Sequence, residues 1–157
     1  MLYREANPAD LPSICALGEE VNSIHHAAWP DVFAGPGAPD RDLAHWSQSV
    51  AADNATTFVA EEDARVVAFV NVSVTTETHS LLQPMRFARI GSISVTASRR
   101  GCGIGSRLMA LAEQWATQKG ARELRLGVWA FNQTALKMYA ELGYEVRAHL
   151  LGKRLAP

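Results

Sequence analysis

The sequence predicts an α/β protein with a mixed central sheet of six to seven strands and about four flanking helices. Runs rich in Val, Phe and Thr alternate with segments whose apolar residues recur every three or four positions. Two strand–helix–strand crossovers, over 87–128 and 123–151, place parallel strands in the C-terminal half. The expected order is β-α-α-β-β-β-α-β-α-β. With 157 residues, 48% of them hydrophobic, the chain suits a single domain over 1–157.

The N-terminal third is expected to hold one short strand and two helices. Leu2–Glu5 is the first strand, and Asn7-Pro8-Ala9-Asp10 is a helix-start signal. Behind it, apolar residues spaced by three and four form one helix face from Leu11 to Ile24. Trp29–Asp40 contains three prolines and two glycines and is expected to be a loop. A weaker helix follows from about Asp40 to Ala52.

The middle of the chain predicts antiparallel strands. Thr56–Glu61 and Arg65–Thr75 are rich in Val, Phe and Thr, and the charged turn Glu62-Asp63-Ala64 between them indicates a hairpin. Glu77–Arg86 is polar, contains Pro84 and is expected to be a loop. Phe87–Val95 is predicted as a further strand.

The C-terminal part predicts alternating helices and strands. Gly103–Lys119 has an apolar side and ends at Gly120, a residue suited to closing a helix. Glu123–Val128 is a predicted strand. Asn132–Leu142 is a predicted helix with Asn132 as its N-cap and Gly143 just beyond its end. Tyr144–Leu151 is the last predicted strand.

Composition excludes several classes of protein. The formal net charge is −1 and no run of Lys and Arg is present, so nucleic-acid binding is not expected. The N-terminus lacks the pattern of a signal peptide, and no stretch of about 18 apolar residues suits a membrane span. Two cysteines, Cys15 and Cys102, form neither a disulfide framework nor a metal cluster. We therefore expect a cytoplasmic protein with no metal and no membrane partner.

The segment after the strand Phe87–Val95 contains three glycines at alternate positions: Gly101, Gly103 and Gly105. Glycine lets a backbone approach a ligand closely, and the helix that begins there adds unbonded N–H groups and a positive dipole end. Arg99, Arg100 and Arg107 add positive charge, so a pyrophosphate suits the segment best. A Walker loop is disfavoured because Gly105-Ser106-Arg107 lacks its lysine, and the position of Glu123 disfavours a dinucleotide fingerprint. A plain glycine-rich turn is the remaining alternative.

Arg100-Gly101-Cys102-Gly103-Ile104-Gly105 resembles the Arg/Gln-x-x-Gly-x-Gly/Ala signature of the GNAT superfamily of N-acetyltransferases. The approach from Val95 to Arg100, Asn132 at the start of the next helix, Tyr139 seven residues later and Leu142-Gly143-Tyr144 also look like that family. The resemblance covers about 87–147, and the order of strands and helices agrees over the whole chain. It implies a GNAT fold and transfer of an acetyl group from acetyl-CoA to an amine.

The resemblance also assigns residues to the acetyl-CoA donor. It implies that the loop holds the pyrophosphate through Arg100, Gly101, Cys102, Gly103, Ile104, Gly105 and Ser106. It implies that the pantetheine arm lies between the strands ending at Val95 and Val128, where the backbone of Ile93 and Val95 bonds it. The Val95 N–H then faces the thioester carbonyl, although both residues also suit a plain strand. Asn132 is expected to cap its helix and to reach the arm.

Tyr139 is the candidate general acid, because a phenol with a pKa near 10 is protonated at neutral pH and can donate to a departing thiolate. A purely structural tyrosine would occupy the same position. Cys102 lies near a helix N-terminus, but no base partner points to a nucleophile. The segment 89–94 contains no glutamate as general base, which leaves water relayed by Ser92 or Ser94 and capture of the neutral amine. Weaker candidate bases are Glu77, His79, His25 and His26.

The acceptor is expected to be a primary amine of a small molecule or peptide. Trp29 and Phe33, with Trp46, His25 and His26, would form an aromatic wall for such an amine, and they suit helix packing or a homodimer interface equally well. Glu77 belongs to the same weak set of acceptor residues. The acidic residues Asp31, Asp40 and Asp42 would attract a polyamine or an aminoglycoside. A non-catalytic acyl-CoA sensor of the same fold is the alternative function.

Overall fold

The computed structural model describes residues 1–38, 40–50 and 52–155. Contacts divide the chain into two compact units, Met1–Gly127 and Val128–Pro157. The single-domain organisation over 1–157 stays a prediction, and each unit is described by itself.

The first unit contains a five-stranded sheet in the order β1-β2-β3-β4-β5. Its strands are β1 (Leu2–Glu5), β2 (Ala55–Glu62), β3 (Arg65–Thr76), β4 (Arg86–Val95) and β5 (Leu124–Arg125). β1 to β4 pair antiparallel, and β5 pairs parallel to β4. The mixed sheet and the predicted crossover between 87 and 128 are therefore confirmed, with five strands in place of the six to seven expected.

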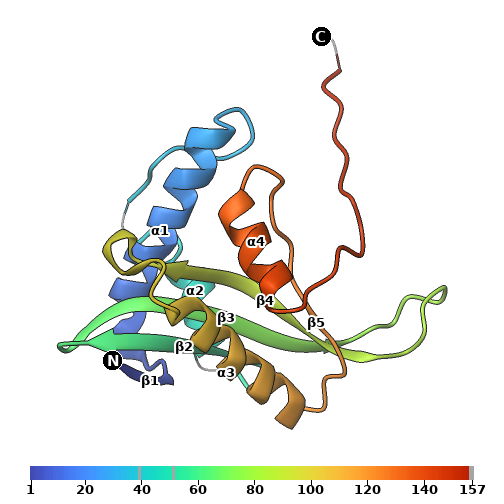
Figure 1. Ribbon diagram of the computed structural model, residues 1–157, viewed down its shortest axis with the longest axis horizontal. Helices are drawn as coiled ribbons and strands as arrows, with labels where there is room; N and C mark the ends of the chain where they lie inside the picture. The colour runs from blue at the N-terminus through green and yellow to red at the C-terminus, as the bar shows by residue number, and fades with distance from the viewer. Residues whose placement is uncertain (39, 51, 156–157) are drawn as a thin grey trace. The chain divides into compact units, whose positions relative to one another are not determined.

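Three helices of the first unit cover the two faces of this sheet (Figure 1): α1 (Leu11–Ala28), α2 (Leu43–Val50) and α3 (Ile104–Gln118). Ile14, Leu17 and Trp46 of α1 and α2 form one buried cluster with Val59 and Phe69 of the sheet. The neighbouring strand residues point to the other face because side chains alternate along a strand. They are buried as well, and α3 packs on β3, β4 and β2.

The N-terminal elements agree closely with those predicted from the sequence. Asn7 accepts a hydrogen bond from the Ala9 N–H and Asp10 from the Asn7 N–H, which closes a capping box around a short 3-10 turn (Pro8–Asp10) before α1. Ile24 is an exception to the predicted apolar face, because it is exposed near the end of α1. α2 begins at Leu43, three residues later than expected. Pro39 in the predicted loop and Ala51 in the predicted helix lie outside the described residues.

The second unit contains α4 (Gln133–Glu141). As predicted, the Asn132 side chain caps this helix by accepting a hydrogen bond from the Ala135 N–H at 3.1 Å. Gly143 follows the helix with φ 87°, a left-handed conformation that glycine adopts without strain.

Two strand predictions in the C-terminal part are wrong. The predicted strand Glu123–Val128 is paired only at Leu124 and Arg125, because its hydrogen bonding with β4 stops after Arg89. Tyr144–Leu151 has the alternating pattern of a strand but is not assigned as a strand. A strand needs a hydrogen-bonding neighbour as well as a pattern, and the pattern alone does not supply one.

Candidate functional site

The glycine-rich loop connects β4 to α3 through a 3-10 turn, Ala97–Arg99. Arg100 is extended, and Gly101 and Gly103 follow with φ 74° and 77°. Residues with a Cβ rarely adopt this left-handed backbone conformation, so the conformation itself favours glycine at both positions. A Cβ built on either glycine meets no atom within 4 Å. Steric contact with the rest of the chain is therefore not the reason for glycine at these positions. The space beside the backbone of both residues is open.

The start of α3 has the properties of an anion site. Gly103 is the N-cap residue, and no side chain caps the helix. The first-turn N–H groups of Ile104, Gly105 and Ser106 consequently remain available, and the first turn contains no acidic residue. The helix dipole favours negative charge at this end. The residues present therefore fit a phosphate-bearing ligand, as the sequence predicts.

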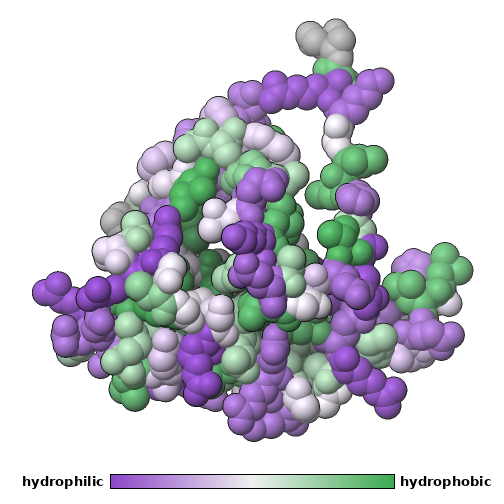
Figure 2. Space-filling view, in the orientation of Figure 1, coloured by the Kyte–Doolittle hydropathy of each residue, from purple (hydrophilic) through white to green (hydrophobic). Residues whose placement is uncertain are grey.

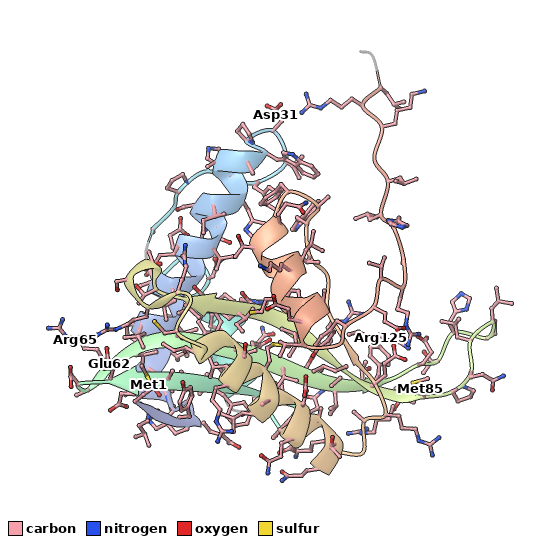
Figure 3. The ribbon with its side chains drawn as sticks, viewed as in Figure 1. Met1, Asp31, Glu62, Arg65, Met85 and Arg125 are labelled. Carbon is pink, nitrogen blue, oxygen red and sulfur yellow. The ribbon has the colours of Figure 1, made fainter. Side chains whose placement is uncertain are left out.

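The arginines around the loop are held by acidic residues. The Arg100 Nε donates to the Val95 carbonyl at 2.9 Å, and its Nη2 lies 3.7 Å from a Glu20 carboxylate oxygen on α1. The Arg99 Nε donates to Glu62 at 2.6 Å, at the end of the β2–β3 hairpin labelled in Figure 3. The predicted positive charge is therefore present, and each of these two arginines contacts a carboxylate. Glu20 was not identified from the sequence, because it lies 80 positions away from Arg100.

Cys102 is exposed, and its Sγ lies 3.6 Å from the Arg100 carbonyl oxygen. No titratable side chain that would activate the thiol contacts it among the described residues. This environment agrees with the interpretation of Cys102 as a small residue in the variable position of the signature.

The last residues of β4 have one edge that no described strand pairs with. β4 pairs with β5 only at Ala88 and Arg89 but continues to Val95. The Thr96 N–H bonds the Val67 carbonyl, on the β3 side. Hydrogen-bonding direction alternates along an antiparallel strand, so Val95 and Ile93 direct their backbone groups to the open edge. This is the edge at which the resemblance expects a pantetheine arm.

A β-bulge changes the direction of this part of β4. Asn71 is opposite Ser92 and Val72 is opposite Ile90, so Gly91 is an extra residue on β4. A Cβ on Gly91 would lie 2.5 Å from the Asn71 Oδ1, which excludes any larger residue without a shift of that side chain. Bulges increase strand twist and often re-aim residues next to active sites. A glycine inside a strand pattern is the sequence signal that indicates such a bulge.

Ser94 and Ser92 differ in their environment. Ser94 is buried, and its Oγ has no hydrogen-bond partner among the described residues. Ser92, two residues earlier, is half-buried. A relay through Ser94 would therefore need a bound water to connect its hydroxyl to the site.

Tyr139 is buried within the second unit. Its ring packs edge-on against Tyr144 with ring centroids 5.7 Å apart. Burial raises the pKa of the Tyr139 phenol above its ordinary value, because the phenolate is poorly solvated there. The residue is consequently protonated at neutral pH, as a general acid must be. The roles of Tyr139 and Asn132 toward the loop stay predictions.

The predicted aromatic wall is only partly assembled. Phe33 packs edge-on against His25, with centroids 4.9 Å apart, and the Phe33 carbonyl lies 2.8 Å from the His26 Nδ1. Trp29 is exposed at the end of α1. Trp46, in contrast, packs on Phe69 in the core, so it does not belong to a surface wall. Helix periodicity places Trp46 on an apolar face but does not decide what covers that face.

Two open cavities lie along α1. One of about 290 Å³ is lined by Asn22, Phe33, Ala34, Arg41 and Asp42. The other, of about 370 Å³, is lined by Ala16, Glu19, Glu20, Ser23, Ile24 and Arg100. The second cavity therefore brings carboxylates of α1 beside the first residue of the glycine-rich loop. Glu19 and Glu20 were not predicted as acceptor residues.

Glu77, at the start of the loop between β3 and β4, makes hydrogen bonds that stabilise the loop. Its carboxylate accepts the N–H groups of His79 and Thr78, each at 3.1 Å, and lies 3.4 Å from Arg125 (labelled in Figure 3). The hydrogen bond from His79, with the other contacts, lowers the pKa of Glu77. A carboxylate with a lowered pKa is a poor general base, which disfavours that role for Glu77.

Comparison with known proteins gives the family of this chain. A model of the acetyltransferase (GNAT) family matches residues 19–144. An aminoglycoside N(6′)-acetyltransferase type 1 from Salmonella enteritidis is 28% identical over 129 residues, which cover 80% of this chain and 89% of the relative.

Two solved structures share the fold over 99% of this chain. A mutant of the BH1408 protein from Bacillus halodurans superposes with a TM-score of 0.93 at 21% identity, covering 99% of this chain and 100% of that one. Aminoglycoside N-acetyltransferase AAC(6′)-Iy in complex with CoA superposes with a TM-score of 0.75 at 20% identity, covering 99% and 100%.

The chain belongs to the GNAT acetyltransferase family. It is an acetyl-CoA-dependent N-acetyltransferase, which confirms the activity predicted from the sequence. No helix in the described ranges is long and apolar enough to span a membrane.

Proposed function

We propose that this chain transfers the acetyl group of acetyl-CoA to a primary amine of a small, multiply charged acceptor of the aminoglycoside type. The observation that carries the proposal is the loop, where two left-handed glycines lead into an α3 N-terminus that no side chain caps. The matched family and the CoA complex of a solved relative support the donor. The name of the Salmonella relative supports the acceptor class.

The donor is held by the chain in two places. The N–H groups at the start of α3 bind the pyrophosphate, and Arg100 exchanges its Glu20 contact for a phosphate oxygen. The outward-facing backbone of Ile93 and Val95 bonds the pantetheine arm at the open edge of β4, as an additional strand would. Bound acetyl-CoA supplies a thioester carbonyl to the acceptor amine. The Val95 N–H donates to that carbonyl oxygen, and one such donor is worth about 3–4 kcal/mol in a transition state.

Two further roles rest on the family resemblance, for residues of the second unit. The Tyr139 hydroxyl gives its proton to the departing sulfur, since burial keeps the phenol protonated. The Asn132 side-chain oxygen already caps α4, which leaves its amide nitrogen to donate to the arm. The acceptor reacts as its neutral amine, so its nitrogen forms the amide bond to the acetyl carbon as the C–S bond breaks. The proton that the nitrogen loses passes to water, and the Tyr139 phenolate takes a proton back from water.

The acceptor side is proposed along α1. Glu19 and Glu20 line the cavity beside Arg100, and Asp42 lines the cavity beside Phe33. Carboxylates in two neighbouring cavities attract a molecule with several ammonium groups more strongly than one with a single charge. A charged acceptor also becomes oriented by these contacts, which favours attack by one particular amine.

An acceptor screen tests the proposal. Purified protein and acetyl-CoA are mixed with aminoglycosides, polyamines, amino acids or peptides, and release of free thiol is followed. We expect the highest kcat/KM for an aminoglycoside with a 6′-amine, the position in the relative's name. An otherwise identical aminoglycoside with a 6′-hydroxyl is the matched control and should release little thiol. Equal rates for the two compounds, or faster acetylation of peptides, would contradict the acceptor class.

A further inference from the structure

Three polar side chains form a hydrogen-bonded chain on one face of the sheet. Ser49 of α2 lies 3.0 Å from Thr57 of β2, and the Asn71 Nδ2 of β3 lies 3.4 Å from the Thr57 Oγ1. Thr57 points to the same face as Val59, a member of the cluster under α1 and α2. In the sheet, Thr57 is opposite Asn71, and Asn71 is opposite Ser92. The polar chain therefore leads across the sheet from α2 to the bulged part of β4.

Two members of this chain are buried in a place where a polar group is costly. Thr57 is 1% exposed and Ser49 is 8% exposed. Figure 2 shows many strongly hydrophilic side chains at the surface, where water solvates them. In the core, a hydroxyl group needs a hydrogen-bond partner within the protein, and an apolar residue of similar size would not. A buried polar chain whose members are satisfied restricts its side chains to one arrangement, so we examined what this chain holds in place.

The directions of the hydrogen bonds fix the orientation of the Asn71 amide. The Ser49 hydroxyl donates its only proton to the Trp46 carbonyl at 2.8 Å, so Thr57 donates to Ser49. The Thr57 oxygen can then only accept, and the Asn71 Nδ2 supplies the donor. The Asn71 Oδ1 consequently points away from Thr57.

The Asn71 Oδ1 lies against Gly91, the extra residue of the β4 bulge. A Cβ on Gly91 would be 2.5 Å from this oxygen, so a residue with a side chain could stand there only if the amide moved. The amide oxygen and the glycine therefore fit each other closely. The chain of hydrogen bonds that begins on α2 ends at this contact.

The position of the bulge decides which residues of β4 face its open edge. With the bulge at Gly91, residue 93 is opposite Val70 and residue 95 is opposite Ala68. Without the extra residue, the strand after Ile90 would be displaced by one position against β3. The backbone groups of Ser92 and Ser94 would then replace those of residues 93 and 95 at the open edge, because the direction alternates along a strand.

We propose that Asn71 is a positioning residue for acetyl transfer. The hydroxyl chain from α2 holds its amide so that the Oδ1 packs on Gly91. This contact keeps the bulge at Gly91 and thereby keeps the backbone of Ile93 and Val95 at the open edge. The inference rests on the proposed function, in which that edge bonds the pantetheine arm and the thioester carbonyl.

Substitutions of Thr57 test the proposal by changing the orientation of the amide. Thr57→Val removes the hydroxyl at nearly constant volume and should lower kcat/KM for acetyl-CoA by about tenfold to a hundredfold, the cost of a misplaced reacting group. Thr57→Ser keeps the hydroxyl and should restore kcat/KM. Thr56→Val, at the neighbouring buried threonine on the opposite face, is the matched control and should keep the wild-type value. Circular dichroism checks that each variant is folded.

A second ligand separates the strand edge from the glycine-rich loop. Adenosine 3′-phosphate 5′-diphosphate is the nucleotide half of CoA and lacks the pantetheine arm, so its Kd should be the same in the wild type and in Thr57→Val. An equal loss of affinity for this fragment and for acetyl-CoA, or full kcat/KM in Thr57→Val, would overturn the proposal. A wild-type protein that does not bind acetyl-CoA would instead refute the donor site itself, and the role of Asn71 with it.

The contact between Asn71 and Gly91 can be tested directly with a double variant. Gly91→Ala introduces the Cβ that lies 2.5 Å from the Oδ1, and Asn71→Ala removes the oxygen. Each single variant should lower kcat/KM by about tenfold or more. In Gly91→Ala/Asn71→Ala the new Cβ occupies the space that the amide leaves, so kcat/KM should be higher than in Gly91→Ala. Losses that multiply in the double variant would show that the two residues act independently and would overturn the proposal.

Discussion

Tyr139 combines the chemistry of an acid with the environment of a core residue. Its phenol is buried, and the resulting rise in its pKa extends the pH range in which it can donate a proton. A structural tyrosine in the same place would contribute through its ring, which packs on Tyr144. Removing only the hydroxyl separates the two roles.

Tyr139→Phe should lower kcat by about a hundredfold or more, the usual contribution of a general acid, and leave the acetyl-CoA Kd nearly unchanged. In the wild type, loss of turnover from deprotonation of Tyr139 is expected only above a pH of about 10, because its pKa is raised from 10. Steady-state kinetics across pH and calorimetric titration provide the two readouts. Tyr144→Phe is the matched control and should retain kcat. Full turnover in Tyr139→Phe would refute the acid role.

Asp10 contributes to stability through one cation and one N–H. Arg4 donates two hydrogen bonds to it at 2.7 and 2.9 Å, and the Asn7 N–H donates another at 2.8 Å. The Arg4 hydrogen bonds are the main reason that the pKa of Asp10 is lowered from its usual value of 3.8. The carboxylate therefore contributes stability that is present above pH 3.8 and is lost as the pH falls through the folded pKa.

Asp10→Asn should lower the free energy of unfolding at pH 7 by about 1–3 kcal/mol, the cost of leaving a partner of a charged hydrogen bond unsatisfied. The difference between variant and wild type should shrink as the pH falls below 3.8. Urea unfolding at several pH values measures both effects. Glu141→Gln removes an exposed carboxylate 3.9 Å from Lys137 and should change little. A difference that grows at low pH would show that Arg4 does not stabilise the Asp10 carboxylate.

At the scale of elements, the short β4–α3 connection must both lead the chain into α3 and leave room for a ligand. The chain needs left-handed residues there to enter α3, and a phosphate ligand needs uncapped N–H groups and no intervening side chain. Gly120, at the other end of α3, has a similar φ of 80° but lies far along the helix from the loop. The two glycines therefore form a matched pair for mutagenesis.

Gly103→Ala and Gly120→Ala should each lower stability by about 1–2 kcal/mol, the cost of a left-handed backbone in an L-residue. Only Gly103→Ala should also weaken acetyl-CoA binding, by about tenfold or more, because its Cβ enters the proposed phosphate space. Thermal unfolding and calorimetric titration give the two quantities. Equal acetyl-CoA affinities in the two variants would contradict the assignment of the loop as the pyrophosphate site.

The contact between α1 and the loop is expected to compete with the donor. Arg100 lies 3.7 Å from Glu20, and both side chains are more than 40% exposed, so the ion pair is weak. Glu20→Gln should therefore tighten acetyl-CoA binding by between about 1.5-fold and fivefold. Glu19→Gln is the control, since Glu19 pairs with Arg41. Weaker binding in Glu20→Gln would mean that Glu20 positions Arg100 for the phosphate and does not compete with it.

At the scale of the whole molecule, a ligand that binds only the folded state raises the unfolding temperature. A donor at a hundred times its Kd contributes about 2.7 kcal/mol, which corresponds to a rise of roughly 5–10 °C for a chain of this size. Acetyl-CoA and CoA should give this shift in a thermal unfolding scan, and ATP should give much less. Arg100→Ala should reduce the shift at the same ligand concentration. An equal shift with ATP would indicate a nucleotide site of a different kind.

The sequence by itself determined the local features of this protein. Helix caps such as Asn7 and Asn132, the glycines at the ends of α3 and α4, and the β2–β3 turn depend on residues within a few positions of one another. The glycine-rich signature is local as well, so an anion site was predictable from Arg100–Ser106, and the neighbouring strands, Asn132 and Tyr139 extended that prediction to the family and the donor. Such features are decided by backbone sterics and short hydrogen bonds, which a linear pattern records.

The tertiary structure decided which distant segments meet. It placed Glu20 beside Arg100, buried Trp46 in the core, located the bulge at Gly91 against Asn71 and ended the pairing of β5 after Arg125. It also assigned no strand to the alternating segment Tyr144–Leu151. The pattern of that segment is local, but strand pairing is a contact between two backbones. The alternation of apolar and polar residues predicts which side chains of a strand are buried. It does not predict which other strand pairs with that backbone.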